Sequence, residues 1–258
     1  YSIITNIDAE HLDFYKSLKN LKKNFSSFIE KTPSLGKTFL CIDDKNIKEV
    51  IKKTNNKNFY TYGLSKDANF NITNTLQKEK YSEFNLKIKI PGSKKEIKKI
   101  KIPLIGMHNI KNAASCAAVA FLIGINDKTI KEGLKNFKGV QRRFNFLFKK
   151  NDALFFDDYA HHPTEISSVL EGVKEVYKKK EIICIFQPHR ISRVKNLKFE
   201  FSRSFKKADT VILCPIYKAS ENIKLGFAYE KFAKLIIKNS NVSPVSYTHL
   251  RAHETTEH

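Results

Sequence analysis

Apolar and polar positions follow two different periods along the first 140 residues. From residue 13 to 31 the apolar side chains recur at every third or fourth position, which predicts an amphipathic helix. Residues 68–102 alternate singly instead, and Pro91 and Gly92 mark a turn, so antiparallel strands are predicted there. Also predicted in this half are strands at 1–6, 38–43 and 59–62, and helices at 44–53, 109–124 and 127–137.

A new pattern begins near residue 140. Short apolar runs predict buried strands at 153–157, 181–186 and 210–214, and helical periods follow them at 165–179, 196–206 and 227–238. Strands and helices that alternate through short loops are typical of a parallel sheet covered by helices. We therefore predict an α/β protein with a domain boundary near residue 140.

The two ends of the sequence differ in character from the rest. Tyr1 opens a strand-like run with no methionine before it, so we expect the front of a longer protein to be missing. From residue 245 to 258, lysine disappears while histidine, threonine and glutamate accumulate. We expect residues 245–258 to be a non-native tail, which leaves predicted domains at 1–140 and 141–244.

The net charge of +21 raises the question of an anionic partner such as nucleic acid or a membrane surface. The excess is nearly all lysine and is spread over the whole chain, whereas phosphate-tracking surfaces usually rely on arginine. No RNA-binding or helix-turn-helix signature accompanies the charge. We interpret it as a solvated lysine surface and predict no nucleic-acid partner.

The cysteines and the hydropathy indicate a compartment. Cys41, Cys116, Cys184 and Cys214 are far apart, lie in apolar runs and form no Cys-x-x-Cys pair, so we expect buried, reduced thiols. The sequence has no signal peptide and no apolar run long enough to cross a membrane. These features predict a cytoplasmic protein with no membrane partner.

Polar side chains gather in two loops of the second half, each directly after a predicted strand. The loops are Asp157–Glu165 and Gln187–Arg193, and together they hold carboxylates, imidazoles and guanidiniums. Ligands bind at the carboxyl ends of strands in open parallel sheets, so we expect both loops to face one sheet edge and to hold a nucleotide or another polyanion. The alternatives are that the two aspartates cap a helix and that the His-Arg pair is only solvated.

Two further segments offer candidate nucleotide contacts. Gly106–Asn112 opens a helix on which Asn109 and Asn112 share one face, and their amides suit the edges of adenine. The alternative is that Asn109 is only an N-cap. Arg142 and Arg143 lie at the domain boundary, where an arginine could reach a phosphate; the alternative is a solvated hinge.

Asn6–His11 combines amide, carboxylate and imidazole groups that suit Mg²⁺ or Mn²⁺, although an ordinary polar turn has the same composition. Leu35–Thr38 matches the end of a phosphate-binding loop. However, Lys31 stands where the first glycine of that motif belongs, and a strand rather than a helix is predicted to follow. We therefore do not expect Leu35–Thr38 to bind phosphate.

Five segments occur in the order found in Mur ligases, the ATP-dependent amide-bond ligases of peptidoglycan synthesis. They are Thr5–Asp13, Gly106–Ala114, Gln141–Phe144, Asp157–Glu165 and Phe186–Arg193. The chain resembles this family from residue 1 to about 244. The resemblance implies the latter part of a central ATPase domain followed by a partial Rossmann-like parallel-sheet domain. A true phosphate-binding loop and the sugar-nucleotide domain are not in the sequence, so we expect no turnover from this chain alone.

The resemblance also implies a reaction and its participants. ATP phosphorylates the lactyl carboxylate of UDP-N-acetylmuramate, and the amine of L-alanine then attacks the acyl phosphate. By resemblance, His11 binds Mg²⁺ (or Mn²⁺), while the groups near ATP are His108, Asn109 and Asn112 at the adenine and Asp158, with Asp157, at the ribose. Arg143 or its neighbour Arg142 reaches the phosphates. The amino-acid and carboxylate side is lined by Tyr159, His161, His162, His189, Arg190 and Arg193.

Two alternatives stay open at this point. A ligase that recycles murein tripeptide onto the same sugar nucleotide shares most of these motifs, and competition between alanine and tripeptide would separate the two. A basic nucleic-acid-binding protein would instead show an affinity that falls steeply with salt.

Overall fold

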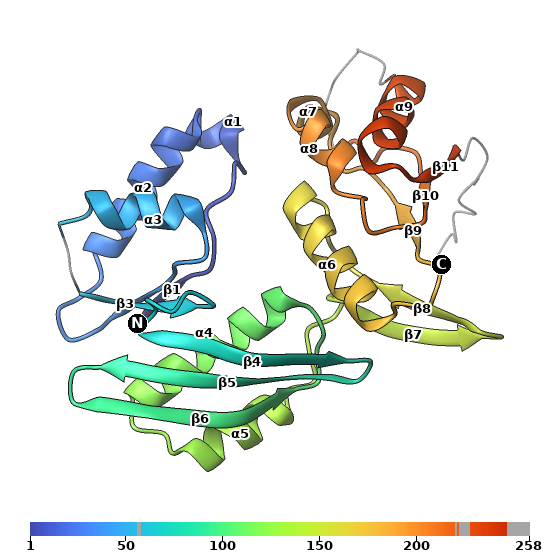
Figure 1. Cartoon of the computed structure of the whole chain (residues 1–258). Coiled ribbons are helices and arrows are strands. Elements are labelled where there is room, and N and C mark those ends of the chain that lie inside the picture. Colours follow the sequence, from blue (N-terminus) through green and yellow to red (C-terminus); the bar gives the residue numbers. More distant parts are fainter. Residues whose placement is uncertain (56–57, 220, 222–227, 247–258) are drawn as a thin grey trace, which may run out of the picture. The chain divides into compact units, whose positions relative to one another are not determined.

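The computed structural model describes the chain except for residues 56–57, 220, 222–227 and 247–258. The chain divides into two compact units, residues 1–138 and the residues from 139 onward (Figure 1). Each unit has its own hydrophobic core.

The first unit is built on a six-stranded sheet with the order β1-β2-β3-β4-β5-β6. Its parallel part consists of β1 (Ser2–Ile4), β2 (Thr38–Cys41), β3 (Phe59–Gly63) and β4 (Phe70–Lys78). β4 continues antiparallel into β5 (Tyr81–Ile90) and β6 (Ser93–Ile102), which confirms the antiparallel prediction for 68–102. β6 is the outermost described strand, and its exposed side chains are Lys94, Lys95, Lys98, Lys99 and Lys101.

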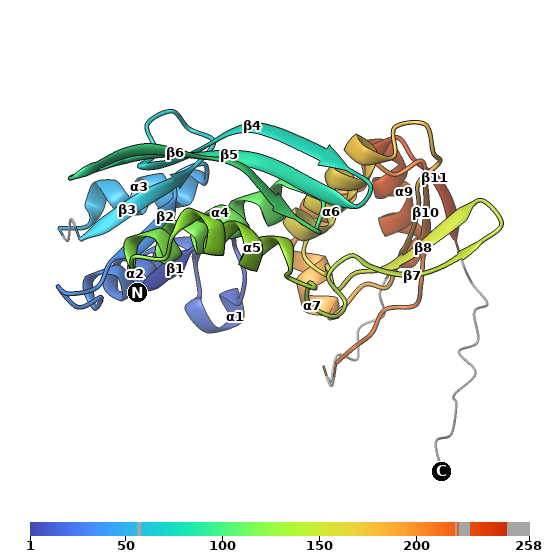
Figure 2. The same ribbon diagram turned by 90° about the horizontal axis from the view of Figure 1, so that it is seen from below.

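Helices complete this unit. They are α1 (Leu12–Tyr15), α2 (Leu18–Glu30), α3 (Lys45–Lys53), α4 (Met107–Leu122) and α5 (Asp127–Lys135). Figures 1 and 2 show α4 and α5 along one face of the sheet. α4 buries small side chains, including Ala114 and Ala118, and these let the helix approach the sheet closely. The sheet contributes fully buried aromatic rings to the same core, among them Phe39, Tyr62, Phe70 and Phe84.

The helix predicted over 13–31 is wrong in one respect, because it is interrupted. Lys16 has a φ of 64°, a left-handed conformation through which a right-handed helix does not continue. Ser17 then caps α2, since its hydroxyl oxygen accepts the N–H of Asn20 over 3.2 Å. The apolar period continues across the break, so periodicity alone predicts a single helix.

Asp43 connects three elements of the first unit. It follows β2, and its carboxylate accepts the N–H groups of Leu64 and Ser65, which follow β3, over 3.0 and 3.2 Å. It also forms an ion pair of 3.0 Å with Lys111 on α4, and both side chains are largely buried. A Cβ added to Gly63 would lie 2.6 Å from the Asp43 carboxylate, so the two loops are in close contact here. Asp43 therefore fixes α4 relative to the ends of β2 and β3.

The described part of the second unit contains two sheets. β7 (Asn145–Lys150) and β8 (Ala153–Asp157) form an antiparallel hairpin. β9 (Ile183–Phe186), β10 (Thr210–Leu213) and β11 (Ser243–Ser246) form a parallel sheet with the order β11-β10-β9. The helices are α6 (Pro163–Val176), α7 (Ile191–Asn196), α8 (Lys198–Arg203) and α9 (Tyr229–Ser240). Their core centres on buried rings, including Phe186, Phe201, Phe205 and Phe232.

Two predictions for this unit are wrong in detail. The strand at 153–157 exists, but it pairs with β7, which was not predicted, and not with the parallel sheet. Asn151, at a φ of 52°, makes the turn, and Phe148 stacks on Phe155 with ring centroids 4.4 Å apart. The predicted loop Gln187–Arg193 gives way to α7 at Ile191, and α8 occupies only part of the helix predicted over 196–206; the two helices meet at Leu197.

Three smaller expectations also concern the fold. Val245 and Ser246, the first residues of the expected tail, belong to β11, and residues 247–258 lie outside the described residues. Cys41 is buried, Cys184 and Cys214 are half-buried and Cys116 is exposed, so the expectation of buried thiols is confirmed only for Cys41. Thr38 begins β2, which confirms that a strand follows Leu35–Thr38. No helix in the described ranges is long and apolar enough to cross a membrane.

Candidate functional site

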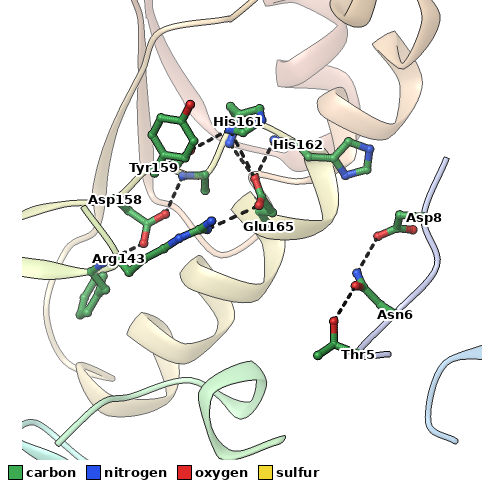
Figure 3. Close-up of polar contacts among 11 residues, drawn as sticks. Thr5, Asn6, Asp8, Arg143, Asp158, Tyr159, His161, His162 and Glu165 are labelled. Atoms are coloured by element: carbon green, nitrogen blue, oxygen red, sulfur yellow. Dashed lines mark hydrogen bonds and ion pairs between the residues drawn. The ribbon is translucent and has the colours of Figure 1, made fainter. Parts of the chain in front are cut away.

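Asp158 organises the first polar loop of the second unit. Its carboxylate accepts the N–H of Phe144 over 2.8 Å and the N–H of Ala160 over 2.7 Å, as Figure 3 shows. The N–H of Tyr159 donates to the carbonyl of Arg142 over 2.7 Å. These bonds join the end of β8 to the segment before β7, so the two arginines 142 and 143 lie beside the loop.

The two arginines share the ring of Tyr159. The guanidinium carbons of Arg142 and Arg143 lie 5.0 and 5.7 Å from the ring centroid. Arg142 also approaches Asp157 at 3.5 Å, and Arg143 approaches Glu165 at 3.5 Å. Both arginines are exposed, so an anionic ligand could reach them in competition with Asp157 and Glu165.

Glu165 is a site residue that the candidate set left out. Its carboxylate accepts the N–H groups of His161 and His162 over 3.0 and 3.3 Å and lies 3.7 Å from the imidazole Nδ1 of His161 (Figure 3). His162 is the N-cap of α6, and Glu165 closes the capping box. The interpretation of Asp157 and Asp158 as the helix caps is therefore wrong, because His162 and Glu165 cap this helix.

The pKa values of the two carboxylates in this loop are shifted in opposite directions. Burial raises the pKa of Asp158, and its hydrogen bonds from Ala160 and Phe144 only partly offset that effect. Burial would also raise the pKa of Glu165, but the His161 N–H, the His161 imidazole and Arg143 together lower it. The surroundings of Glu165 thus favour its carboxylate form, whereas burial favours the neutral form of Asp158.

We expect the stabilisation by Glu165 to depend on pH. Because its folded pKa is lowered from the ordinary 4.5, its contribution is present above pH 4.5 and is lost as pH falls through the folded pKa. Glu165→Gln should lower the free energy of unfolding by about 1 kcal/mol at pH 7, and by less at pH 3. Urea unfolding of both proteins at the two pH values checks this; an equal difference at both would contradict it. Glu171→Gln, on the exposed part of α6, is the control.

The second polar loop meets the first. The rings of His161 and His189 lie 5.9 Å apart, although β8 and β9 belong to different sheets. The expectation of one shared sheet edge is therefore wrong, whereas the expected meeting of the two loops is confirmed within this unit. Tyr159 contacts His161 edge-on at 4.9 Å, so three rings lie in sequence along the site.

His189 lies among cations. Burial lowers its pKa, and the neighbouring Arg193, His161 and Arg190 lower it further, while Glu221 opposes them. Nη1 of Arg193 is 3.4 Å from Nδ1 of His189. Arg190 has a φ of 65°, and its buried Nε has no hydrogen-bond partner among the described residues. An unpaired buried guanidinium N–H is costly, so this loop is suited to an anionic group.

The nucleotide candidates of the first unit lie on the first turns of α4. Gly106, at a φ of 98°, is the N-cap, and its N–H donates to the side chain of Gln77. The alternative that Asn109 is an N-cap is therefore wrong; its amide donates to the carbonyl of Ile105 over 2.7 Å. A Cβ on Gly106 would lie 2.6 Å from the His108 ring, so glycine leaves room for that imidazole. Asn112, exposed on α4, keeps its side chain accessible.

The metal candidate His11 has little support from its surroundings. It is exposed, at a φ of 53°, and precedes α1. Upstream of it, Thr5 donates to Asn6 and Asn6 donates to Asp8, the arrangement of a polar turn (Figure 3). Within the described residues, no group of three or more His, Cys, Asp or Glu side chains could hold a metal ion. The residues described here therefore do not form a complete Mg²⁺ site.

Sequence reasoning also missed Tyr217, whose ring lies 5.3 Å from that of His189. Tyr217 comes a few residues after β10, so the rule that singled out the loops after β8 and β9 would have found it. Neither Tyr217 nor Glu221 belongs to a recognisable motif, which is why they escaped.

Comparison with known proteins shows the family to which the chain belongs. The family model described as Mur ligase middle domain matches residues 1–120, and the model described as Mur ligase, glutamate ligase domain matches residues 142–254. The chain therefore belongs to the Mur ligase family and matches its middle domain followed by its glutamate ligase domain. The expected α/β fold with two successive Mur ligase domains agrees with these matches.

Individual relatives show which members of the family the chain is similar to. UDP-N-acetylmuramate–L-alanine ligase of Pelagibacter ubique is 60% identical over 243 residues, which are 94% of this chain and 52% of that protein. Among solved structures, the UDP-N-acetylmuramate-alanine ligase MurC of Thermotoga maritima matches with a TM-score of 0.67 at 24% identity, covering 94% of this chain and 49% of that one. A murein peptide ligase of Psychrobacter arcticus matches with a TM-score of 0.61 at 20% identity, covering 94% and 48%. The chain spans about half the length of the curated relatives it matches.

Proposed function

We propose that this chain is part of an ATP-dependent ligase that joins L-alanine to the lactyl carboxylate of UDP-N-acetylmuramate through an acyl phosphate. The observation that carries the proposal is the meeting of the Asp157–Glu165 and Gln187–Arg193 loops, which gathers arginines and imidazoles around one ring cluster. The 60% identity to the Pelagibacter ligase supports the choice of substrates. Such a reaction belongs to peptidoglycan precursor synthesis, and its nucleotide-linked substrates suit the cytoplasm.

The charges of the site suit the proposed chemistry. Phosphoryl transfer to a carboxylate brings two anionic reactants together, so cations must stabilise the charge that develops. Arg143, Arg190 and Arg193 would supply these cations. The buried Nε of Arg190 is suited to this role, since none of the described residues accepts a hydrogen bond from it. Burial and the neighbouring cations lower the pKa of His189, so it contributes a hydrogen-bonding group and not a further positive charge.

We assign two groups of residues to ATP. His108, Asn109 and Asn112 would contact adenine, although the amide of Asn109 already donates to Ile105. Asp158, with Asp157 beside it, would accept from the ribose hydroxyls. Both oxygens of Asp158 already accept one N–H each, but a carboxylate has about four acceptor positions, so capacity remains.

Tyr159, His161 and His162 would line the side that receives the amino acid. Tyr159 and His161 are suited to this because their rings meet His189 and the arginines. His162 is less suited, because it is buried as the cap of α6. His11 would provide one ligand to Mg²⁺, but since the described residues form no complete metal site, no step is assigned to the ion.

A chimera tests the proposal. Residues 1–244 of this chain would replace the matching half of the Pelagibacter ligase, and phosphate release would be measured with ATP, UDP-N-acetylmuramate and L-alanine. We expect release that requires all three substrates, and none above a no-enzyme blank from this chain alone. Preference for murein tripeptide over L-alanine would favour the recycling ligase. Phosphate release that does not depend on any amine substrate would refute the proposal.

A filter-binding titration of this chain with DNA and RNA at two salt concentrations addresses the remaining alternative. Tight binding that weakens steeply with salt would favour a nucleic-acid-binding protein.

A further inference from the structure

The His189–Arg193 loop is held in place by a second segment, which follows β10. Tyr217 forms a parallel bridge with His189. The N–H of Arg190 donates to the carbonyl of Tyr217 over 2.8 Å, and the N–H of Tyr217 donates to the carbonyl of Pro188 over 2.8 Å. These two bonds fix the backbone on both sides of His189.

Glu221 adds a side-chain contact to the same loop. Its carboxylate accepts the N–H of Ser192 over 3.2 Å and also accepts the Ser192 hydroxyl. Burial would raise the pKa of Glu221, but the Ser192 hydroxyl, the backbone N–H groups and Arg190 together lower it. Ser192 lies in the first turn of α7, so Glu221 anchors the start of the helix that carries Arg193.

Arg193 in turn determines which hydrogen-bonding group His189 presents. A guanidinium only donates hydrogen bonds, so Nδ1 of His189, 3.4 Å from Nη1 of Arg193, must accept. In the neutral imidazole the proton then resides on Nε2. His189 consequently offers an N–H donor to a ligand and not a basic nitrogen.

We propose that Glu221 is a positioning residue: by anchoring Ser192 it directs Arg193 onto His189 and holds the imidazole as an Nε2–H donor for the carboxylate of the substrate. The identity of that carboxylate rests on the proposed function. We call the series of contacts from Glu221 through Ser192 and Arg193 to His189 the brace. These contacts do not depend on the identity of the substrate.

Nitrogen-15 NMR of the 258-residue chain, labelled in histidine, tests the brace. His189→Gln identifies the resonances of His189. At a pH where His189 is neutral, with Arg190, Arg193, His161 and Glu221 as its charged or titratable neighbours, we expect an unprotonated Nδ1 and a protonated Nε2. Glu221→Ala should reduce this tautomer preference about five- to tenfold, the effect of losing one hydrogen-bonded support. Glu221→Gln, which keeps an acceptor for the Ser192 hydroxyl, should restore most of it.

Glu200→Ala removes an exposed carboxylate from α8 in the same unit and should leave the His189 signals unchanged. A proton on Nδ1 in the unmodified chain, or an unchanged tautomer in Glu221→Ala, would overturn the inference. If Glu221→Ala does not fold, Ser192→Ala is measured in its place, with the same two outcomes.

Ligand addition separates this inference from the proposed function. L-alanine and inorganic phosphate are titrated into the same labelled chain. If neither moves the His189 signals while the tautomer still depends on Glu221, the brace stands and the assignment of the site to a carboxylate or phosphate substrate fails.

Discussion

Arg190→Ala is expected to lower kcat/KM of the active chimera by about 10²- to 10³-fold, the cost of removing one donor aimed at developing negative charge. Arg190 is held at a φ of 65° with a buried Nε that has no partner among the described residues. Such a donor contributes most when the ligand supplies its partner. Steady-state phosphate release with L-alanine as the varied substrate measures the effect.

The matched control is Arg203→Ala, which removes an exposed arginine from the neighbouring helix α8. It should change kcat/KM by less than twofold, since this position lies outside the ring cluster. Equal losses in the two variants would show that general positive charge matters and not the position of Arg190. An unchanged kcat/KM in Arg190→Ala would remove that residue from the site.

Asp43→Ala should destabilise the first unit by about 3–5 kcal/mol, the cost of removing one partner from a largely buried ion pair. The change leaves Lys111 without its carboxylate and leaves the N–H groups of Leu64 and Ser65 without their acceptor. Lys111 precedes Asn112, so the start of α4 should loosen as well. Urea unfolding followed by circular dichroism measures the free energy.

Asp127→Ala is the control for Asp43→Ala. Asp127 pairs with Lys95 at 2.7 Å, but both side chains are well exposed, so the loss should be below about 1 kcal/mol. If the two variants lose the same free energy, burial does not distinguish these ion pairs, and the role given to Asp43 is wrong.

Much of the fold could be predicted because the apolar period records which face of each element is buried. The single alternation over 68–102 predicts the meander, and the short apolar runs predict β9 and β10. The interruption at Lys16 could not be predicted from the period, since the apolar positions continue across it. β7 escaped because its side chains are mostly exposed, so its residues show no buried face.

The candidate site, too, could be predicted only in part. The strand-end rule predicted the loops that hold Asp158 and His189, because backbone topology determines where such loops lie. Glu165 was not predicted as a site residue, although its partners His161 and His162 are its near neighbours in sequence and the capping-box spacing was available to indicate it. Glu221 was not predicted because only the folded chain brings it to Ser192. For the lysine surface, the sequence predicted only that it is solvated.

The lysines of β6 have a consequence for the behaviour of the chain in concentrated solution. An outermost strand offers free backbone groups to which the same strand of another molecule could add, extending the sheet from chain to chain. In β6 the exposed Lys94, Lys95, Lys98, Lys99 and Lys101 would bring two dense rows of like charge face to face in such a pairing. Mutual repulsion therefore opposes fibril-like growth from this edge, and the protection weakens as salt screens the charges.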